Sequence, residues 1–242
     1  RDGCSETDPN HLMALYGLAT TWNLRLPSGD QDKKAARALY DRVVALDPES
    51  DMAAWSQLAK ARMLHLVPVG KEPDYAAVRA AYAGVYAQYP GHYAGHEAFI
   101  YNQATVVQTW DRSAVTRAAA RMRTFVERHP DSALLSAAYE VLASAYEVLN
   151  QPRERMDALV LGLEALILSP DNPTQENSWR YWRIATLAEF EVGDFKTARH
   201  FYTRMLEEYP QDVRRYGAEK ALQRMEMLEA KLRKAPASGG ES

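Results

Sequence analysis

The stretch LEEYPQDV (residues 206–213) closes an amphipathic segment with a proline and a polar turn, and four similar stretches precede it. These are ALDPESDM, AQYPGHYA, ERHPDSAL and ILSPDNPT. The prolines of the five stretches are spaced 42, 40, 40 and 40 residues apart and are Pro48, Pro90, Pro130, Pro170 and Pro210. A period of this length indicates a repeat architecture in which each repeat is one supersecondary unit.

Between successive prolines the sequence has the pattern of two helices. In the clearest unit, SWRYWRIATLAEFEV and KTARHFYTRMLEEYP each carry apolar residues at helical spacing, and GDF separates them. Gly193 can take the left-handed conformation that ends a helix, and Asp194 can cap the next one. Pro210 cannot continue the second helix, because its ring keeps the preceding residue out of the α region. Each proline is therefore expected to follow an αα-hairpin.

The same template predicts an all-α chain of five stacked αα-hairpins and a capping helix over about 212–233, whose surface is mostly charged. Residues 1–10 are expected to be an N-terminal extension, 11–234 one solenoid domain and 235–242 (APASGGES) a disordered tail. The predicted first helices are 11–25, 51–66, 92–109, 133–149 and 176–192. The predicted second helices are 31–46, 73–89, 113–129, 153–169 and 194–209.

In its last unit the sequence resembles the tetratricopeptide repeat (TPR) family. The residues at the family's spacing in GDFKTARHFYTRMLEEYP are Gly193, Asp194, Phe195, Ala198, Tyr202 and Pro210. The resemblance implies a right-handed superhelix with a concave groove lined by the first helices, which binds protein partners. The period of 40 exceeds the family's of about 34, and Glu189 precedes Phe190 out of phase with the family's pattern, so only the last repeat matches closely.

Composition narrows the classes of partner. The chain has 242 residues and a formal net charge of −3, which gives no electrostatic basis for binding nucleic acid. No apolar run reaches the roughly 18 residues of a membrane span. Neither a transmembrane segment nor a nucleic-acid partner is expected.

Cys4 is the single cysteine of the chain and forms no internal disulfide. The chain begins at Arg1 rather than Met, so we expect a processed or trimmed product. In RDGCSET the glycine before Cys4 suits a bacterial lipoprotein cleavage site, whereas Arg1 and Asp2 do not, so Cys4 is either a lipid attachment site or a free thiol. ERHPDS and LEEYPQD also resemble TPR lipoproteins of bacterial outer-membrane assembly. This favours an extracytoplasmic, periplasmic or membrane-associated location over a cytoplasmic one.

The expected first helices carry side chains of the types that anchor protein interfaces. These candidate partner-binding residues are Tyr16, Trp55, Tyr93, Tyr101, Asn102, Trp179, Arg180 and Arg183. The alternative for each aromatic is a place in the core between helices, and for each arginine a solvated helix face. The predicted function is a scaffold or assembly factor that holds a partner segment in the groove.

The helix ALVLGLEALIL (158–168) is apolar all round except for Glu164. Neighbouring hairpins either cover both of its faces, or its outward strip contacts a partner or a second copy. The second interpretation gives the alternative function, a permanent subunit of a larger complex docked through this helix.

Enzyme chemistry has little support in the sequence. His92 and His96 lie one helical turn apart beside Glu97, which suits a metal, but Ile100 stands where a zincin has its next ligand. A phosphate-binding glycine loop and a nucleophile elbow are absent from the sequence. We therefore expect no catalytic residue, metal or cofactor, and a metal-dependent enzyme that uses His92 and His96 remains a minor alternative.

Overall fold

The computed structural model describes residues 5–26, 29–169 and 176–234, and within these ranges the chain is helical throughout, with no strand. Cys4, the tail 235–242 and the proline turn at Pro170 lie outside the described residues. The chain divides into two compact units, residues 1–109 and 110–242. All eleven predicted helices are present, with boundaries shifted by about three residues at most when the π-helical residues 188–192 are counted with the ninth helix.

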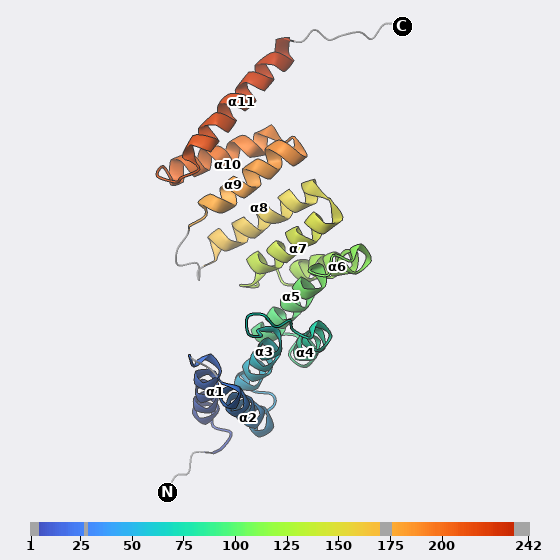
Figure 1. Cartoon of the computed structure of the whole chain (residues 1–242), viewed down its shortest axis with the longest axis vertical. Helices are drawn as coiled ribbons and strands as arrows, with labels where there is room; N and C mark the ends of the chain where they lie inside the picture. Colours follow the sequence, from blue (N-terminus) through green and yellow to red (C-terminus); the bar gives the residue numbers. More distant parts are fainter. Residues whose placement is uncertain (1–4, 27–28, 170–175, 235–242) are drawn as a thin grey trace. The chain divides into compact units, whose positions relative to one another are not determined.

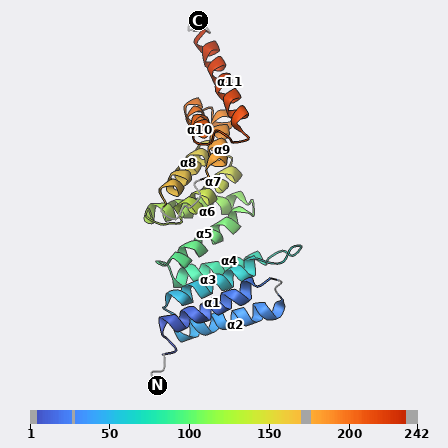
Figure 2. The ribbon, with the colours of Figure 1, turned by 90° about the vertical axis from the view of Figure 1, so that its left-hand side faces the viewer.

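The first unit contains five helices (Figure 1), which are α1 (Pro9–Leu24), α2 (Asp30–Leu46), α3 (Asp51–His65), α4 (Tyr75–Gln88) and α5 (Tyr93–Val107). Helices that follow one another in the sequence pack together, and α1, α3 and α5 also meet in succession. Figure 2 shows α1 to α4 lying side by side. Small residues on α3 allow this close packing, because Ala53, Ala54 and Ala61 lie fully buried against Tyr82 of α4.

The second unit contains α6 (Arg112–Arg128), α7 (Leu135–Leu149), α8 (Pro152–Leu168), α9 (Ser178–Leu187), the π-helical turn η1 (Ala188–Val192), α10 (Phe195–Glu208) and α11 (Arg215–Lys234). Consecutive helices again pack as neighbours, and α8 also contacts η1. Helix α11 packs against α10 at the end of this unit. The coarse prediction of an all-helical chain with neighbouring helices packed in pairs is confirmed.

Three of the proline turns share one geometry, whereas Asp47 before Pro48 (φ −151°, ψ 92°) and Ser169 before Pro170 (φ −70°, ψ 126°) are extended. In these three turns the residue before the proline leaves the α region, with φ, ψ of −127°, 57° at both Tyr89 and His129 and −131°, 63° at Tyr209. Its backbone N–H still donates into the helix, and its carbonyl then accepts from the N–H three residues on, as in His92 to Tyr89. The proline thus ends one helix and begins a turn that leads into the next.

Two proline turns are tied to a neighbouring segment by the tyrosine that precedes the proline. The hydroxyl of Tyr89 donates to the carbonyl of Pro48, 2.8 Å away, in the preceding turn. The hydroxyl of Tyr209 accepts from the backbone N–H of Asn177, 3.0 Å away, at the start of α9. Tyr89 therefore links two consecutive repeats, whereas Tyr209 ties the end of α10 to the start of α9 within one repeat.

Buried residues repeat along the chain with the same period as the prolines. The residues twelve positions before each proline are all buried and are Ala36, Val78, Ala118, Ala158 and Ala198. The residues eight positions before each proline are also buried and are Tyr40, Tyr82, Met122, Gly162 and Tyr202. One side of every second helix thus supplies a small or β-branched residue and then, in four units, a large one.

Gly162 of α8 is the exception in this series of large residues. A Cβ at Gly162 would lie 2.9 Å from the Cβ of Tyr139 on α7, so α7 and α8 approach each other too closely for a side chain at this position.

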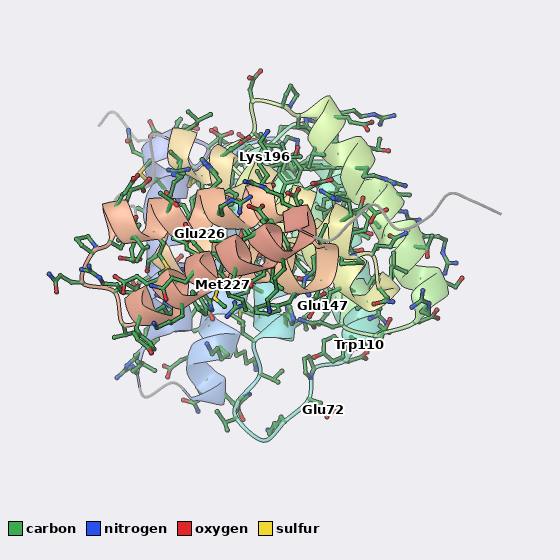
Figure 3. The ribbon with its side chains drawn as sticks, turned by 90° about the horizontal axis from the view of Figure 1, so that it is seen from above. Glu72, Trp110, Glu147, Lys196, Glu226 and Met227 are labelled. Carbon is green, nitrogen blue, oxygen red and sulfur yellow. The ribbon has the colours of Figure 1, made fainter. Side chains whose placement is uncertain are left out.

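Four of the described joints between helices contain a residue in the left-handed region. Glycine and asparagine tolerate this conformation, as at Gly70 (φ 86°), Gly193 (φ 75°) and Asn150 (φ 58°), whereas a bulky residue such as Trp110 (φ 58°) rarely adopts it. Figure 3 labels Trp110, which stands on the turn before α6 and is 68% exposed.

Substitution of two glycines tests the packing of α4 and α5. A Cβ at Gly95 on α5 would lie 1.8 Å from the carbonyl oxygen of Tyr89, whereas a Cβ at Gly84 on α4 meets nothing within 4 Å. We expect Gly95→Ala to lower the free energy of unfolding by about 3 kcal/mol. Gly84→Ala should raise it by about 0.5–1 kcal/mol, because alanine favours the helix. Urea denaturation measures both, and equal effects of the two substitutions would contradict the close approach of α5 to Tyr89.

Candidate functional site

Helices α3 and α5 bring one continuous row of aromatic and charged side chains together in the first unit. Tyr93, Glu97 and Tyr101 lie four residues apart on α5, so they share one side of that helix. Trp55 and Arg62, seven residues apart on α3, lie against them. We call these five residues the α3/α5 face.

The contacts across the α3/α5 face run from one end of the helices to the other. The rings of Trp55 and Tyr93 have centroids 5.5 Å apart, and Arg62 forms an ion pair with Glu97. The guanidinium of Arg62 also lies 5.8 Å from the ring centroid of Tyr101. Arg62 of α3 thus joins the two helices through its contacts with Glu97 and Tyr101 of α5.

Two tyrosines of the α3/α5 face remain open to solvent. Tyr93 is 42% exposed and Tyr101 is 38% exposed, although Tyr101 stacks on the buried ring of Tyr82 with centroids 5.7 Å apart. An aromatic ring that is fixed by its neighbours loses little conformational entropy when a partner covers it. Tyr93 and Tyr101 therefore have the properties of interface anchors.

Burial and neighbouring groups shift the pKa values of Arg62, His65 and Tyr82 at and beside the α3/α5 face. Burial opposes the charged form of Arg62, but the neighbouring Glu97 raises the pKa of Arg62 above its usual value. Burial lowers the pKa of His65, whose Nδ1 lies 3.1 Å from the hydroxyl of Tyr82. Burial likewise raises the pKa of Tyr82. The α3/α5 face therefore presents aromatic surface, and its two charged residues, Arg62 and Glu97, pair with each other.

Two other candidate residues of this unit have structural contacts. Tyr16 packs on Tyr40 of α2, with centroids 5.8 Å apart, beside the buried Ala36. The side-chain amide of Asn102 donates to the carbonyl of Arg79 on α4, 2.7 Å away. Both side chains brace neighbouring helices.

In the second unit, Trp179, Arg180 and Arg183 lie on α9. The guanidinium of Arg180 stacks 4.4 Å from the ring centroid of Trp179, which is 40% exposed. Nη1 of Arg183 donates to Oε2 of Glu140 on α7 over 2.8 Å. Arg183 therefore joins two helices, and its removal would cost more than that of a solvated surface charge.

His92 and His96 have structural contacts in the turn and first part of α5. Nδ1 of His92 accepts from the backbone N–H of Ala94 as a helix cap, and its Nε2 lies 3.4 Å from Asp51. Nε2 of His96 lies 3.0 Å from the carbonyl oxygen of Pro90. Across the described ranges, no group of three or more His, Cys, Asp or Glu residues is placed to hold a metal ion.

Helix α8 has one buried side and one side that is partly exposed. Ala158, Leu159 and Leu163 are buried, whereas Leu161 is 45% and Leu168 is 82% exposed. A groove of about 530 Å³ lies between α8 and α10, with Leu161 and Phe201 among its lining residues. One side of α8 therefore belongs to the core, and the other is partly open to solvent.

A buried carboxylate in the second unit was not among the residues singled out from the sequence. The π-helical turn η1 adds a residue to the last turn of α9, which brings Glu189 into the interior and leaves Phe190 exposed. Oε1 of Glu189 accepts from Nε and Nη2 of Arg224 on α11, at 2.8 and 2.6 Å. Its Oε2 accepts from the hydroxyl of Tyr202 on α10, 3.1 Å away.

This network gives a structural role to Glu189 at the end of the first helix. Burial together with Glu189 raises the pKa of Tyr202, which keeps its hydroxyl protonated as a donor. Glu189 therefore joins α10 and α11 through two donors. The signal in the sequence was the order of Glu189 and Phe190, out of phase with the apolar stripe of α9.

Comparison with known proteins identifies no relative. No model of a known protein family matches the chain, and no curated protein sequence matches it significantly. Among the described residues, no helix combines the length and the apolar character that crossing a bilayer requires.

Because Arg224 pairs with the buried Glu189, we expect its loss to lower the free energy of unfolding more than the loss of Arg215, another arginine of α11. Arg224→Met leaves a buried carboxylate without its cation and should lower the free energy of unfolding by about 2–3 kcal/mol. Arg215→Met removes a partner of Glu219 in an exposed pair and should cost about 0.5 kcal/mol or less. Urea denaturation at neutral pH measures both. Equal losses would show that the buried pair does not hold α11.

Proposed function

We propose that this protein is a helical-repeat scaffold that binds a segment of a partner protein on the α3/α5 face. The observation that carries the proposal is the pair of exposed tyrosines, Tyr93 and Tyr101, fixed by Trp55 and by Arg62 on the neighbouring helix. The repeated hairpins supply the architecture, a TPR-like superhelix of five hairpins with a terminal cap.

The geometry of the face favours a partner segment with apolar side chains. Tyr93 and Tyr101 are eight residues apart, or about 12 Å along α5. A partner in helical or extended form can place two apolar side chains at that spacing. Because Arg62 is already paired with Glu97, affinity would come from burial of aromatic surface more than from new ion pairs.

A second candidate function is a permanent complex formed through α8. The groove between α8 and α10 and the exposed Leu161 and Leu168 favour it. This interface would be mainly apolar, as in obligate complexes, and would withstand high salt.

Site-specific photo-crosslinking in native extract distinguishes the two functions. We expect p-benzoylphenylalanine in place of Tyr93 or Tyr101 to form a discrete adduct with one partner. The same group in place of Tyr216, an exposed tyrosine of α11, should form none and serves as the control. An adduct at Leu161 alone would move the partner to the α8/α10 groove, and equal labelling at Tyr216 would contradict a specific site.

Affinity for the partner identified by crosslinking gives the energetic test. Replacing both Tyr93 and Tyr101 by Ala should weaken binding by about 2 kcal/mol, or roughly thirtyfold. Thermal melting checks that the variant folds, because Tyr101 also packs on Tyr82. A folded double variant with wild-type affinity would exclude the α3/α5 face.

A further inference from the structure

Helix α6 in the second unit carries a concentration of positive charge. Its 17 residues contain five arginines and one acidic residue, Glu127, in a chain whose formal net charge is −3. Arg117, Arg121 and Arg128 follow one another at i, i+4 and i+11, so they share one side of the helix. All three are exposed. We call these three residues the Arg row.

The arginines of α6 differ from most other described arginines, which pair with carboxylates. Ion pairs are formed by Arg25, Arg42, Arg62, Arg153, Arg155, Arg183, Arg199, Arg204, Arg214, Arg215, Arg224 and Arg233. Within the described part of the chain, no arginine of α6 forms one. Arg112 instead donates to the carbonyls of Val148 and Leu149 at the end of α7, and Arg117 donates to the hydroxyl of Ser113.

This arrangement opposes the stability of the helix. Like charges four residues apart, such as Arg117 and Arg121, destabilise a helix, and no described carboxylate forms an ion pair with either. A negatively charged partner would supply the missing charges. Guanidinium groups bind carboxylates through paired hydrogen bonds, which gives such a contact directionality.

Other features of α6 narrow the class of anionic partner. Its apolar residues, which include Val115, Met122 and Phe125, are buried, and none of the exposed large apolar side chains belongs to this helix. Helices that insert into a membrane interface expose such side chains. Proteins that bind single-stranded nucleic acids pair basic groups with stacked aromatics, and α6 has no exposed aromatic.

We propose that the Arg row docks a segment of a partner protein that is rich in Asp and Glu. The row spans about 16 Å, since Arg117 and Arg128 are eleven residues apart. An acidic helix can lie along it, and an extended segment with an acidic residue at every second position matches the spacing of about 6 Å between Arg117 and Arg121. This interaction is independent of the α3/α5 face, which belongs to the other unit.

The same helix provides a matched control. Arg123 is exposed, but it lies two residues from Arg121 and therefore points about 200° away around the helix axis. Arg121→Glu and Arg123→Glu change the net charge by the same amount. A difference in peptide affinity between the two variants is therefore not an effect of net charge.

Binding of a fluorescein-labelled peptide of about twelve glutamates, long enough to span the row in either conformation, is measured by fluorescence anisotropy. We expect saturable binding by the full chain that weakens as salt rises. Arg121→Glu should weaken it about tenfold or more, and Arg117→Glu combined with Arg121→Glu should abolish it. Arg123→Glu should change it less than about threefold. Circular dichroism checks that each variant is helical.

Three outcomes would overturn the proposal. The first is the absence of saturable binding by the wild-type chain at low salt. The second is an equal effect of Arg121→Glu and Arg123→Glu, which would reduce the interaction to net charge. The third is binding to phosphatidylglycerol vesicles that depends on Arg121 while the glutamate peptide does not bind, because this would assign the Arg row to a membrane surface.

Discussion

The exclusion of the residue before proline from the α region is the constraint on which the rest of the fold depends. It ends a helix at Tyr89, His129 and Tyr209 with nearly the same dihedral angles. The buried positions eight and twelve residues earlier then fall on equivalent sides of the second helices. The regular spacing of the prolines therefore accounts for the regular positions of both the turns and the buried residues.

Close approach between helices is the second requirement, and small residues meet it. Ala198 and its equivalents admit the neighbouring helix, and Gly95 lets α5 approach the carbonyl of Tyr89. At Gly162, where other units have a large residue, α8 instead approaches Tyr139 on α7 too closely for a side chain. A repeat can therefore lose a signature residue without losing its packing.

Most charges of the first helices stabilise the fold. Arg62 with Glu97 joins α3 to α5, Arg183 with Glu140 joins α9 to α7, and Glu189 holds Arg224 of α11. The surfaces left for partners are the exposed rings of the α3/α5 face, the open side of α8 and the unpaired arginines of α6. The three surfaces differ in chemistry, so they would recognise partners of different kinds.

The sequence by itself determined the helices, their boundaries to within about three residues and the period of the core. These follow from local rules, namely proline geometry, helix caps such as Asp194 and apolar periodicity. Residue type and place also singled out Trp55, Tyr93 and Tyr101 as candidates on α3 and α5, but not Arg62, which lies against them. Their binding role, the resemblance to TPR proteins and the attachment of lipid at Cys4 stay predictions.

Only the tertiary structure decided which side chains are already engaged. That Arg183 reaches Glu140, and that the π-helical turn buries Glu189 against Tyr202 and Arg224, depends on helices more than ten residues apart in sequence. The absence of ion pairs on the described α6 was likewise visible only once the partners of the other arginines were known. Periodicity places a residue on a side of its helix, but the neighbouring helices determine what it meets there.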